Sequence, residues 1–200
     1  LKGLQSDWIN PIYVDENNTI WFGTYTGISI YDGQEIKNIT EADGLPKYPM
    51  NDLIKDSKGN FWGAFNQGGV AKIDNDSITV YSKETGDFIA DQIHTIAEDN
   101  EGNILVGGTG GLSIYNGEDW ENYTYQETMG GGYIRNIFVE GTDIWLGTGD
   151  GLVYKSGDNT KLYTRKDGLP HRRIQHVERG PDGNLWLGTQ RGLSIFDGLK

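Results

Sequence analysis

The chain has 200 residues, a net charge of −12, 30 glycines and no cysteine. The lack of cysteine excludes a disulfide framework and a thiolate metal site. The excess of carboxylates argues against nucleic acid or an anionic membrane as a partner, because phosphate groups are bound by Lys and Arg. Aromatic residues make up 12% of the chain, which is too many for a disordered glycine-rich segment. No apolar run approaches the roughly 18 residues of a spanning helix, so no membrane insertion is expected within this chain.

The chain begins and ends with the same pattern. "NTIWFGTYTGISIYDG" occupies residues 18–33, and "GNLWLGTQRGLSIFDG" occupies residues 183–198. An element of the form I/L-W-x-G recurs with spacings of 41, 43, 40 and 41 residues, at Trp21, Trp62, Leu105, Trp145 and Trp186. Self-similarity at this period predicts a repeat architecture. We expect a single domain over residues 1–200, with repeats at about 2–42, 43–85, 86–126, 127–166 and 167–200.

Within each repeat, four short strands are expected in chain order. A polar turn such as "DSKGN" separates the first strand from the second, which carries the recurring Trp; "GLSIY" and its variants form the third strand, and a closing run such as "SITVYS" forms the fourth. Alternating β-branched and aromatic residues between Gly, Asn and Asp turns are typical of strands. Four antiparallel strands in about 41 residues predict an all-β fold, a β-propeller of four-stranded blades. The first strand holds an apolar pair at Ile9/Ile12, Met50/Leu53, Ile93/Ile96, Ile134/Ile137 and Ile174/Val177.

The recurring Trp predicts how the blades pack. A twisted sheet has two apolar faces, and stacking blades around an axis buries both, so each blade needs a bulky side chain at the same place. The fifth repeat stops at "FDGLK" before its closing run, so we expect four blades of four strands and one of about three. Five blades form either a complete five-bladed ring or part of a larger ring. A part would expose an apolar face and could form a homo-oligomer.

Taken together, "DGLP", the apolar pair and "GNLWLGTQRGLSIFDG" resemble the two-component regulator propeller repeat. The resemblance covers the whole chain and is most specific in repeats one and five. Repeat two has one extra residue and Ala64 in place of Gly, repeat three has Leu105 in place of Trp, and repeat four lacks "DGLP". The resemblance implies a periplasmic or extracellular sensor domain of a bacterial hybrid histidine kinase, which perceives a carbohydrate.

The most variable positions of the repeats indicate where a ligand binds. By analogy with other propellers, the loops that enter the first strands and the loops between the second and third strands share one face, around the mouth of the central channel. Aromatic side chains mixed with amides and Arg suit a polyhydroxylated ligand, and the cations of "DGLPHRR" favour an acidic or sulfated saccharide. A solvated ring of loops without a ligand is the simpler alternative. The candidate ligand-binding residues are Trp8, Tyr25, Gln92, His94, Tyr133, Arg135, Arg172, Arg173, Gln190 and Arg191, and Asn10, Asn51 and Gln175 share the strand position of His94 and Arg135.

No cofactor, metal or catalytic residue is predicted. The turns "DSKGN" and "DNEGN" supply one or two side-chain oxygens each, whereas Ca²⁺ takes six to eight, so hairpin turns capped by Asp explain them better. The three His residues match no zinc spacing. Two alternatives to a non-catalytic sensor remain. "GPDGNLWLGT" at residues 180–189 resembles streptogramin lyases, which use a His, a Glu and Mg²⁺, although His94 has no Glu in register. The other alternative is a structural interaction or dimerisation module that binds a protein partner.

Overall fold

The computed structural model describes residues 3–74, 77–128 and 132–197. These residues form five antiparallel sheets, four with four strands and one with three, in which each strand pairs with its neighbours in sequence. The predicted all-β propeller fold and its strand count are therefore confirmed. Two 3-10 turns, Glu41–Asp43 and Arg165–Asp167, precede the second and fifth sheets. No helix among the described residues is long and apolar enough to cross a membrane.

The blades follow the order of the repeats. Blade 1 contains β1 (Ile9–Val14), β2 (Ile20–Thr24), β3 (Gly27–Tyr31) and β4 (Ile36–Thr40). Blade 2 contains β5 (Met50–Lys55), β6 (Phe61–Phe65), β7 (Gly69–Asp74) and β8 (Ser77–Tyr81). Blade 3 contains β9 (Ile93–Glu98), β10 (Ile104–Gly108), β11 (Gly111–Tyr115) and β12 (Trp120–Thr124). Blade 4 contains β13 (Ile134–Glu140), β14 (Asp143–Thr148), β15 (Leu152–Ser156) and β16 (Asn159–Tyr163), and blade 5 contains β17 (Ile174–Arg179), β18 (Leu185–Thr189) and β19 (Gly192–Phe196).

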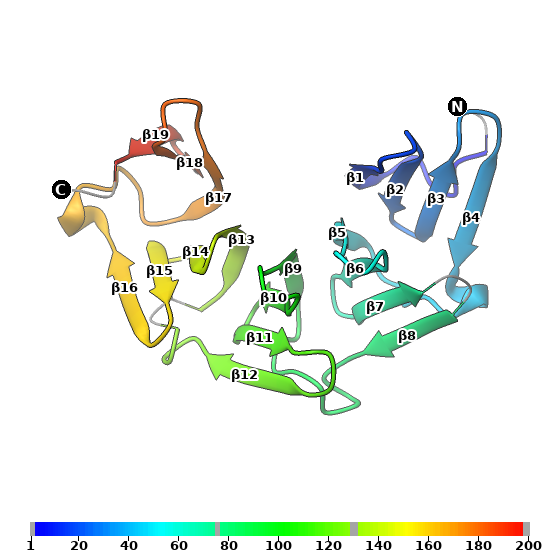
Figure 1. Cartoon of the computed structure of the whole chain (residues 1–200), viewed down its shortest axis with the longest axis horizontal. Helices are drawn as coiled ribbons and strands as arrows, with labels where there is room; N and C mark the ends of the chain where they lie inside the picture. Colours follow the sequence, from blue (N-terminus) through cyan, green and yellow to red (C-terminus); the bar gives the residue numbers. More distant parts are fainter. Residues whose placement is uncertain (1–2, 75–76, 129–131, 198–200) are drawn as a thin grey trace.

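The five blades form an open arc and not a closed five-bladed ring (Figure 1). The first strand of each blade lies on the inner side of the arc, and the fourth strands β4, β8, β12 and β16 lie on the outside. Neighbouring inner strands contact one another along the whole series. Blades 1 and 5 face each other across the opening, so each has one face without a neighbouring blade.

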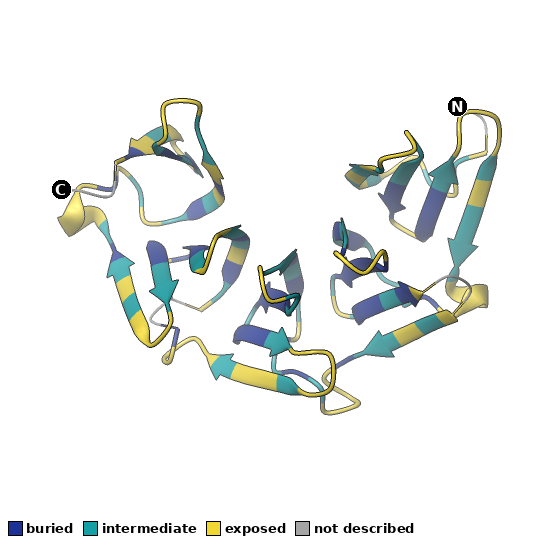
Figure 2. Cartoon of the chain, in the orientation of Figure 1, coloured by how far each residue is buried: buried dark blue, intermediate teal, exposed yellow. Residues whose placement is uncertain are grey.

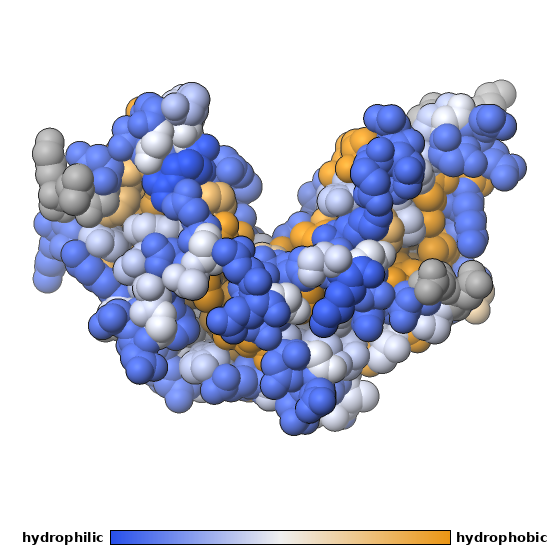
Figure 3. Space-filling model, viewed as in Figure 1, coloured by the Kyte–Doolittle hydropathy of each residue, from blue (hydrophilic) through white to orange (hydrophobic). Residues whose placement is uncertain are grey.

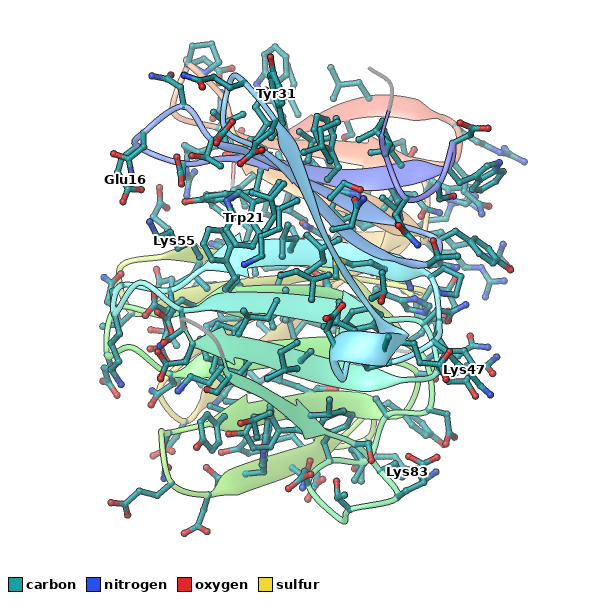
Figure 4. All side chains as sticks on the ribbon, turned by 90° about the vertical axis from the view of Figure 1, so that its right-hand side faces the viewer. Glu16, Trp21, Tyr31, Lys47, Lys55 and Lys83 are labelled. Carbon is teal, nitrogen blue, oxygen red and sulfur yellow. The ribbon has the colours of Figure 1, made fainter. Side chains whose placement is uncertain are left out.

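The recurring Trp fills the space between blades, as its position predicts. Trp62 is 1% exposed and packs in the apolar cluster between blades 2 and 3, and Trp145 is 8% exposed between blades 4 and 5. Trp21 stacks on Phe61 of blade 2 with ring centroids 3.5 Å apart, and at the edge of the same seam a Glu16–Lys55 ion pair joins the two blades (Figure 4). Leu105 takes the same role between blades 3 and 4 without an aromatic ring.

The two end faces expose side chains that are buried at equivalent places within the arc. Ile12 on β1 is 59% exposed, whereas Leu53 at the same position of blade 2 is 5% exposed. Leu193 on β19 is 61% exposed, whereas Leu152 at the same position of blade 4 is fully buried. Buried residues concentrate where blades meet, and hydrophobic surface borders the hollow of the arc (Figures 2 and 3).

The polar turns are capped by aspartate, as the hairpin interpretation of "DSKGN" predicts. Asp56 Oδ1 accepts hydrogen bonds from the backbone N–H groups of Lys58 (3.0 Å) and Asn60 (2.7 Å), and Asp56 Oδ2 accepts one from Trp62 Nε1 (2.8 Å). The turn that follows Asp99 has the same backbone hydrogen bonds. These carboxylates therefore fix the first hairpin of a blade.

Polar side chains at the third position of the inner strands join one blade to the next. Each accepts a hydrogen bond from a backbone N–H of the following inner strand, which satisfies a backbone donor that the blade's own ladder leaves free. Burial raises the pKa of Asp52, one of these groups, above its ordinary value. The bonds are Ile96 N to Asp52 Oδ2 at 3.0 Å, Ile137 N to Thr95 Oγ1 at 3.4 Å and Val177 N to Asn136 Oδ1 at 2.8 Å.

Candidate functional site

The two sets of loops that vary most between repeats lie together on one face of the arc. In four blades, a backbone N–H at the start of the second loop donates to the carbonyl oxygen of the residue that enters the inner strand. Because this bond recurs, side chains of both loops are presented at the same end of each blade. The bonds are Tyr25 N to Trp8 O (3.2 Å), Asn66 N to Pro49 O (2.8 Å), Thr109 N to Gln92 O (2.9 Å) and Gly149 N to Tyr133 O (3.3 Å).

A polar cavity of about 420 Å³ lies at this end of the inner strands. Five of its lining residues occupy the second position of an inner strand, one from each blade, and the other two come from the adjoining loops. All of the lining side chains are polar, and none is a carboxylate. We call this cavity the polar well; its lining residues are Asn10, Asn51, Asn66, Gln92, His94, Arg135 and Gln175.

Two amides of the polar well are held in place by the neighbouring blade. Asn10 Nδ2 donates to the carbonyl oxygens of Met50 and Asn51, at 3.3 and 3.4 Å, and Asn51 Nδ2 donates to Ile93 O at 2.6 Å. The backbone of the next blade thus accepts hydrogen bonds from the NH₂ group of each amide. The side-chain carbonyl oxygen of each amide can still accept a hydrogen bond from a ligand. Fixed acceptors of this kind bind ligand hydroxyl groups without a large loss of side-chain entropy.

His94, Tyr133 and Arg135 form a connected group at the junction of blades 3 and 4. The Arg135 guanidinium lies 4.9 Å from the centroid of the Tyr133 ring, and the His94 ring meets Tyr133 edge-on at 6.3 Å. Burial, with a smaller effect of the Arg135 charge, lowers the pKa of His94 from 6.5 to about 4. His94 is therefore neutral near pH 7 and offers one donor and one acceptor. Among the described residues that line the polar well, Arg135 is the only charged side chain at that pH.

A second cavity of about 310 Å³ continues from the polar well toward blade 1. The two cavities share Asn10, Asn51 and Asn66, but the second also has apolar and aromatic walls. Trp8 and Tyr25 are 75% and 55% exposed, so their rings are available to solvent. We call this cavity the aromatic shelf; its other lining residues are Ile9, Thr24, Pro49 and Met50.

The candidate residues from the sequence thus divide into two groups. Gln92, His94 and Arg135 line the polar well, Tyr133 lies under Arg135, and Trp8 and Tyr25 line the aromatic shelf. The other candidates, which all belong to blade 5, lie outside the linings of both cavities; they are Arg172, Arg173, Gln190 and Arg191. There, Arg172 pairs with Asp150 at 3.1 Å, Arg173 Nη1 donates to Gln190 Oε1 at 3.2 Å, and the backbone N–H of Arg191 donates to Thr189 Oγ1 at 3.1 Å.

The cations of "DGLPHRR" therefore do not act together as three free charges. Asp150 offsets the charge of Arg172, and His171 Nδ1 accepts the backbone N–H of Arg173. The structure adds three amides to the candidate site, all at the strand position of His94: Asn10, Asn51 and Gln175. In the sequence, the strand position that these amides share with His94 is the sign that they belong to the site. Only the curvature of the arc shows that their side chains converge on one cavity.

No group of three or more His, Asp and Glu residues that could hold a metal ion occurs within the part of the chain that the structure describes. A proton-transfer mechanism needs a group whose pKa lies near the working pH, and the pKa of His94 is about 4.

Comparisons with known proteins agree with this repeat architecture. The family model of the two-component regulator propeller matches residues 3–26 and 168–191. These segments lie in blades 1 and 5, where the sequence pattern is most regular. Residues 3–26 and 168–191 therefore match the two-component regulator propeller repeat.

Solved structures share the fold of this repeat protein. The extracellular domain of the putative hybrid two-component system BT3049 from B. thetaiotaomicron superposes with a TM-score of 0.82 and 17% identity, over 98% of this chain and 29% of that chain. A streptogramin B lyase structure gives a TM-score of 0.71 and 18% identity, over 99% of this chain and 71% of that chain. At these identities the likeness concerns the fold alone.

A curated relative is the chloroplastic photosystem II stability/assembly factor HCF136 of Guillardia theta. It is 30% identical over 162 residues, which cover 76% of this chain and 38% of the relative. The chain thus spans well under half of the length of this relative and less than a third of the sensor domain. Similar sequences and folds therefore occur in proteins whose names describe different functions.

Proposed function

We propose that this propeller is a non-catalytic recognition domain that binds a small carbohydrate in the polar well and on the aromatic shelf. The observation that carries the proposal is the lining of the polar well, which combines oriented amides, a neutral His94 and no carboxylate. Sugar hydroxyl groups pair with such donors and acceptors, and exposed rings such as Trp8 and Tyr25 pack on the apolar face of a sugar.

The proposed ligand carries negative charge. Arg135 faces no carboxylate within the lining of the polar well, so an acidic or sulfated saccharide would supply its counter-ion. The whole chain has a charge of −12, which repels anions at long range. This acidic preference should therefore depend on the local contact with Arg135 and should weaken as salt increases.

The proposed setting is the extracytoplasmic sensor part of a bacterial two-component signalling protein. The matched repeat family and the fold shared with extracellular domains of such systems support it. A lyase-type enzyme is the main competitor, since a streptogramin B lyase has the same fold. The lack of a carboxylate in the polar well favours binding over that chemistry.

Calorimetry with ligands chosen from a glycan array tests the proposal. Gln92→Ala should weaken binding about tenfold or more, because it removes a group that lines the polar well. Tyr133→Ala should also weaken binding, because Arg135 loses the ring on which its guanidinium rests. Gln190→Ala, on the same face but outside both cavities, is the matched control and should bind as the wild type does. Arg135→Gln should remove the preference for acidic over neutral oligosaccharides. Failure of every glycan to bind would refute the proposal, and turnover that requires added Mg²⁺ would favour the enzyme.

A further inference from the structure

The seam between blades 3 and 4 is built from smaller side chains than the other three seams. In blades 1, 2 and 4 the recurring Trp lies opposite a large residue of the inner strand. These cross-strand pairs are Trp21 with Tyr13, Trp62 with Ile54, and Trp145 with Phe138. Blade 3 has Leu105 opposite Ala97 at this place. Two large side chains are therefore replaced by smaller ones in a single seam, which leaves space beside blade 4.

The facing wall of blade 4 is correspondingly less covered. In the other seams the recurring Trp packs on the residue that comes just before the Trp position of the next blade. These residues, Phe61, Ile104 and Leu185, are 7%, 2% and 1% exposed. Ile144 has the same place in blade 4 and is only partly buried. The missing aromatic ring of blade 3 thus uncovers an apolar side chain of blade 4.

A cavity of about 330 Å³ lies in this seam, at the end of the blades where the polar turns are. Val139 and Ile144 of blade 4 line one side of it, and residues 99–101 of the blade 3 turn line another. We call this cavity the seam pocket. Its turns follow the inner strands, whereas the polar well lies where those strands begin. The two cavities are therefore at opposite ends of the blades.

The mouth of the seam pocket lacks a link that the other seams have. In those seams a charged side chain at the sixth position of the inner strand reaches the first hairpin of the preceding blade. The links are Lys55 with Glu16 at 2.6 Å, Glu98 with Ser57 Oγ at 2.6 Å, and Arg179 Nε with Glu140 at 2.9 Å. Val139 has this position in blade 4 and offers no polar side-chain group. The described residues thus form no such link across the seam pocket.

One carboxylate of the seam pocket lacks the indole that its counterparts bind. Asp56 and Asp182 each accept the N–H of the Trp in their own hairpin, at 2.8 and 3.1 Å. Asp99 has the same place in blade 3, and its Oδ2 accepts Asn103 Nδ2 at 2.9 Å but no indole. Since a carboxylate oxygen has two lone pairs, Asp99 Oδ2 can accept one more N–H. The seam pocket thus combines an apolar wall with an available acceptor.

We propose that the seam pocket is a binding site for a small aromatic amine with an indole-type ring. The ring takes the place of the Trp that blade 3 lacks and packs on Val139 and Ile144. Its ring N–H donates to Asp99 Oδ2, as Trp62 does to Asp56 in blade 2. A flat ring supplies the large apolar area that Leu105 cannot cover. This site is independent of the carbohydrate proposal, because none of its residues lines the polar well or the aromatic shelf.

The charges at the seam pocket favour a cationic ligand over an anionic one. Asp99 and Glu101 line it, and no Lys or Arg is among its described lining residues. Lys155 lies on the neighbouring strand, but its ammonium is bound to Gly157 O at 2.7 Å and lies 5.6 Å from the centroid of the Tyr123 ring. An ammonium substituent on the ligand should therefore be attracted, and a carboxylate should be repelled.

NMR titration of the whole chain with tryptamine tests the proposal, because methyl signals report weak binding at a known place. Tryptamine should shift the methyl signals of Val139 and Ile144 in a saturable way. 1-Methyltryptamine, which lacks the ring N–H, should bind at least fivefold more weakly, because Asp99 loses a donor. Indole-3-acetate has the same ring with a carboxylate in place of the ammonium, and it should bind at least tenfold more weakly.

Leu105→Trp restores the side chain of the other blades. It should abolish these shifts and raise the melting temperature, because the new ring fills the seam pocket. Leu105→Met is the matched control, since it nearly keeps the volume of Leu, and it should bind tryptamine as the wild type does. Val139→Lys, which places a long side chain at the mouth as Lys55 does in blade 2, should weaken binding at least tenfold and decides the question if Leu105→Trp does not fold.

The proposal is overturned if tryptamine causes no saturable shift of either methyl signal. Equal affinity for tryptamine and 1-methyltryptamine would show that Asp99 receives no N–H, and equal affinity for indole-3-acetate would show that the carboxylates have no effect; either result also overturns it. Binding of tryptamine at wild-type strength by folded Leu105→Trp or Val139→Lys would place the ligand elsewhere, with the same consequence.

Discussion

The open arc predicts that two leucines at the same repeat position differ sharply in their contribution to stability. Leu152 is fully buried between blades 4 and 5, and Leu193, one repeat later, is 61% exposed on the end face. Replacing a buried Leu by Ala costs about 2.7–5.0 kcal/mol, because transfer energy is lost and a cavity remains. An exposed site usually changes stability by less than about 0.5 kcal/mol.

The difference between Leu152→Ala and Leu193→Ala should therefore exceed about 2 kcal/mol. For a chain of this size, each kcal/mol shifts the melting temperature by about 2–4 °C. We expect Leu152→Ala to lower it by about 6–15 °C, measured by circular dichroism, while Leu193→Ala stays close to the wild type. Urea titrations with equal slopes would show that the same unfolding transition is compared. Equal losses at low protein concentration would refute the open end face of blade 5.

Three further predictions concern the turns, the histidine and the end faces. Asp56→Ala should lower the free energy of unfolding in urea by about 1–3 kcal/mol more than Asp99→Ala does. Asp56, unlike Asp99, also accepts a hydrogen bond from a buried indole N–H. The folded-state pKa of His94 is about 4, below its ordinary value of 6.5. The unfolded chain therefore takes up a proton at His94 before the folded chain does, so the free energy of unfolding should fall as the pH drops from about 6.5 to about 4. NMR titration should give the low pKa directly. Light scattering should detect concentration-dependent association through the exposed apolar end faces, and Ile12→Ser with Ile195→Ser should reduce it; a strictly monomeric wild type would contradict this.

The scaffold could be predicted from the sequence because packing imposes the same demand on every blade. The Trp62 position must fill a seam, so a bulky residue recurs there at a readable spacing. The strand order and the three-stranded fifth blade followed from counting repeats. The curvature was not predictable, because it depends on small rotations between blades that no single residue determines.

The site was only partly predictable, because the curvature of the arc decides which side chains converge. His94 and Arg135 stood out as unusual residues at a repeated position, and the structure places both in the polar well. Asn10 and Asn51 looked like ordinary strand polar residues, and their hydrogen bonds to the next blade appear only in three dimensions. The Arg172 charge looked available in the sequence, but Asp150, 22 residues earlier, pairs with it.

The differences between the repeats point to a recognition surface. At the second position of the inner strands the residue changes in most blades, and its side chain fills no apolar seam, so this position is free to bind a ligand. Asn10 and Asn51 use their NH₂ groups to bond to the next blade, but their carbonyl oxygens still face the polar well. A varied residue on a constant scaffold therefore indicates recognition of a small molecule, and changes at this position should alter ligand binding more than they alter the stability of the propeller.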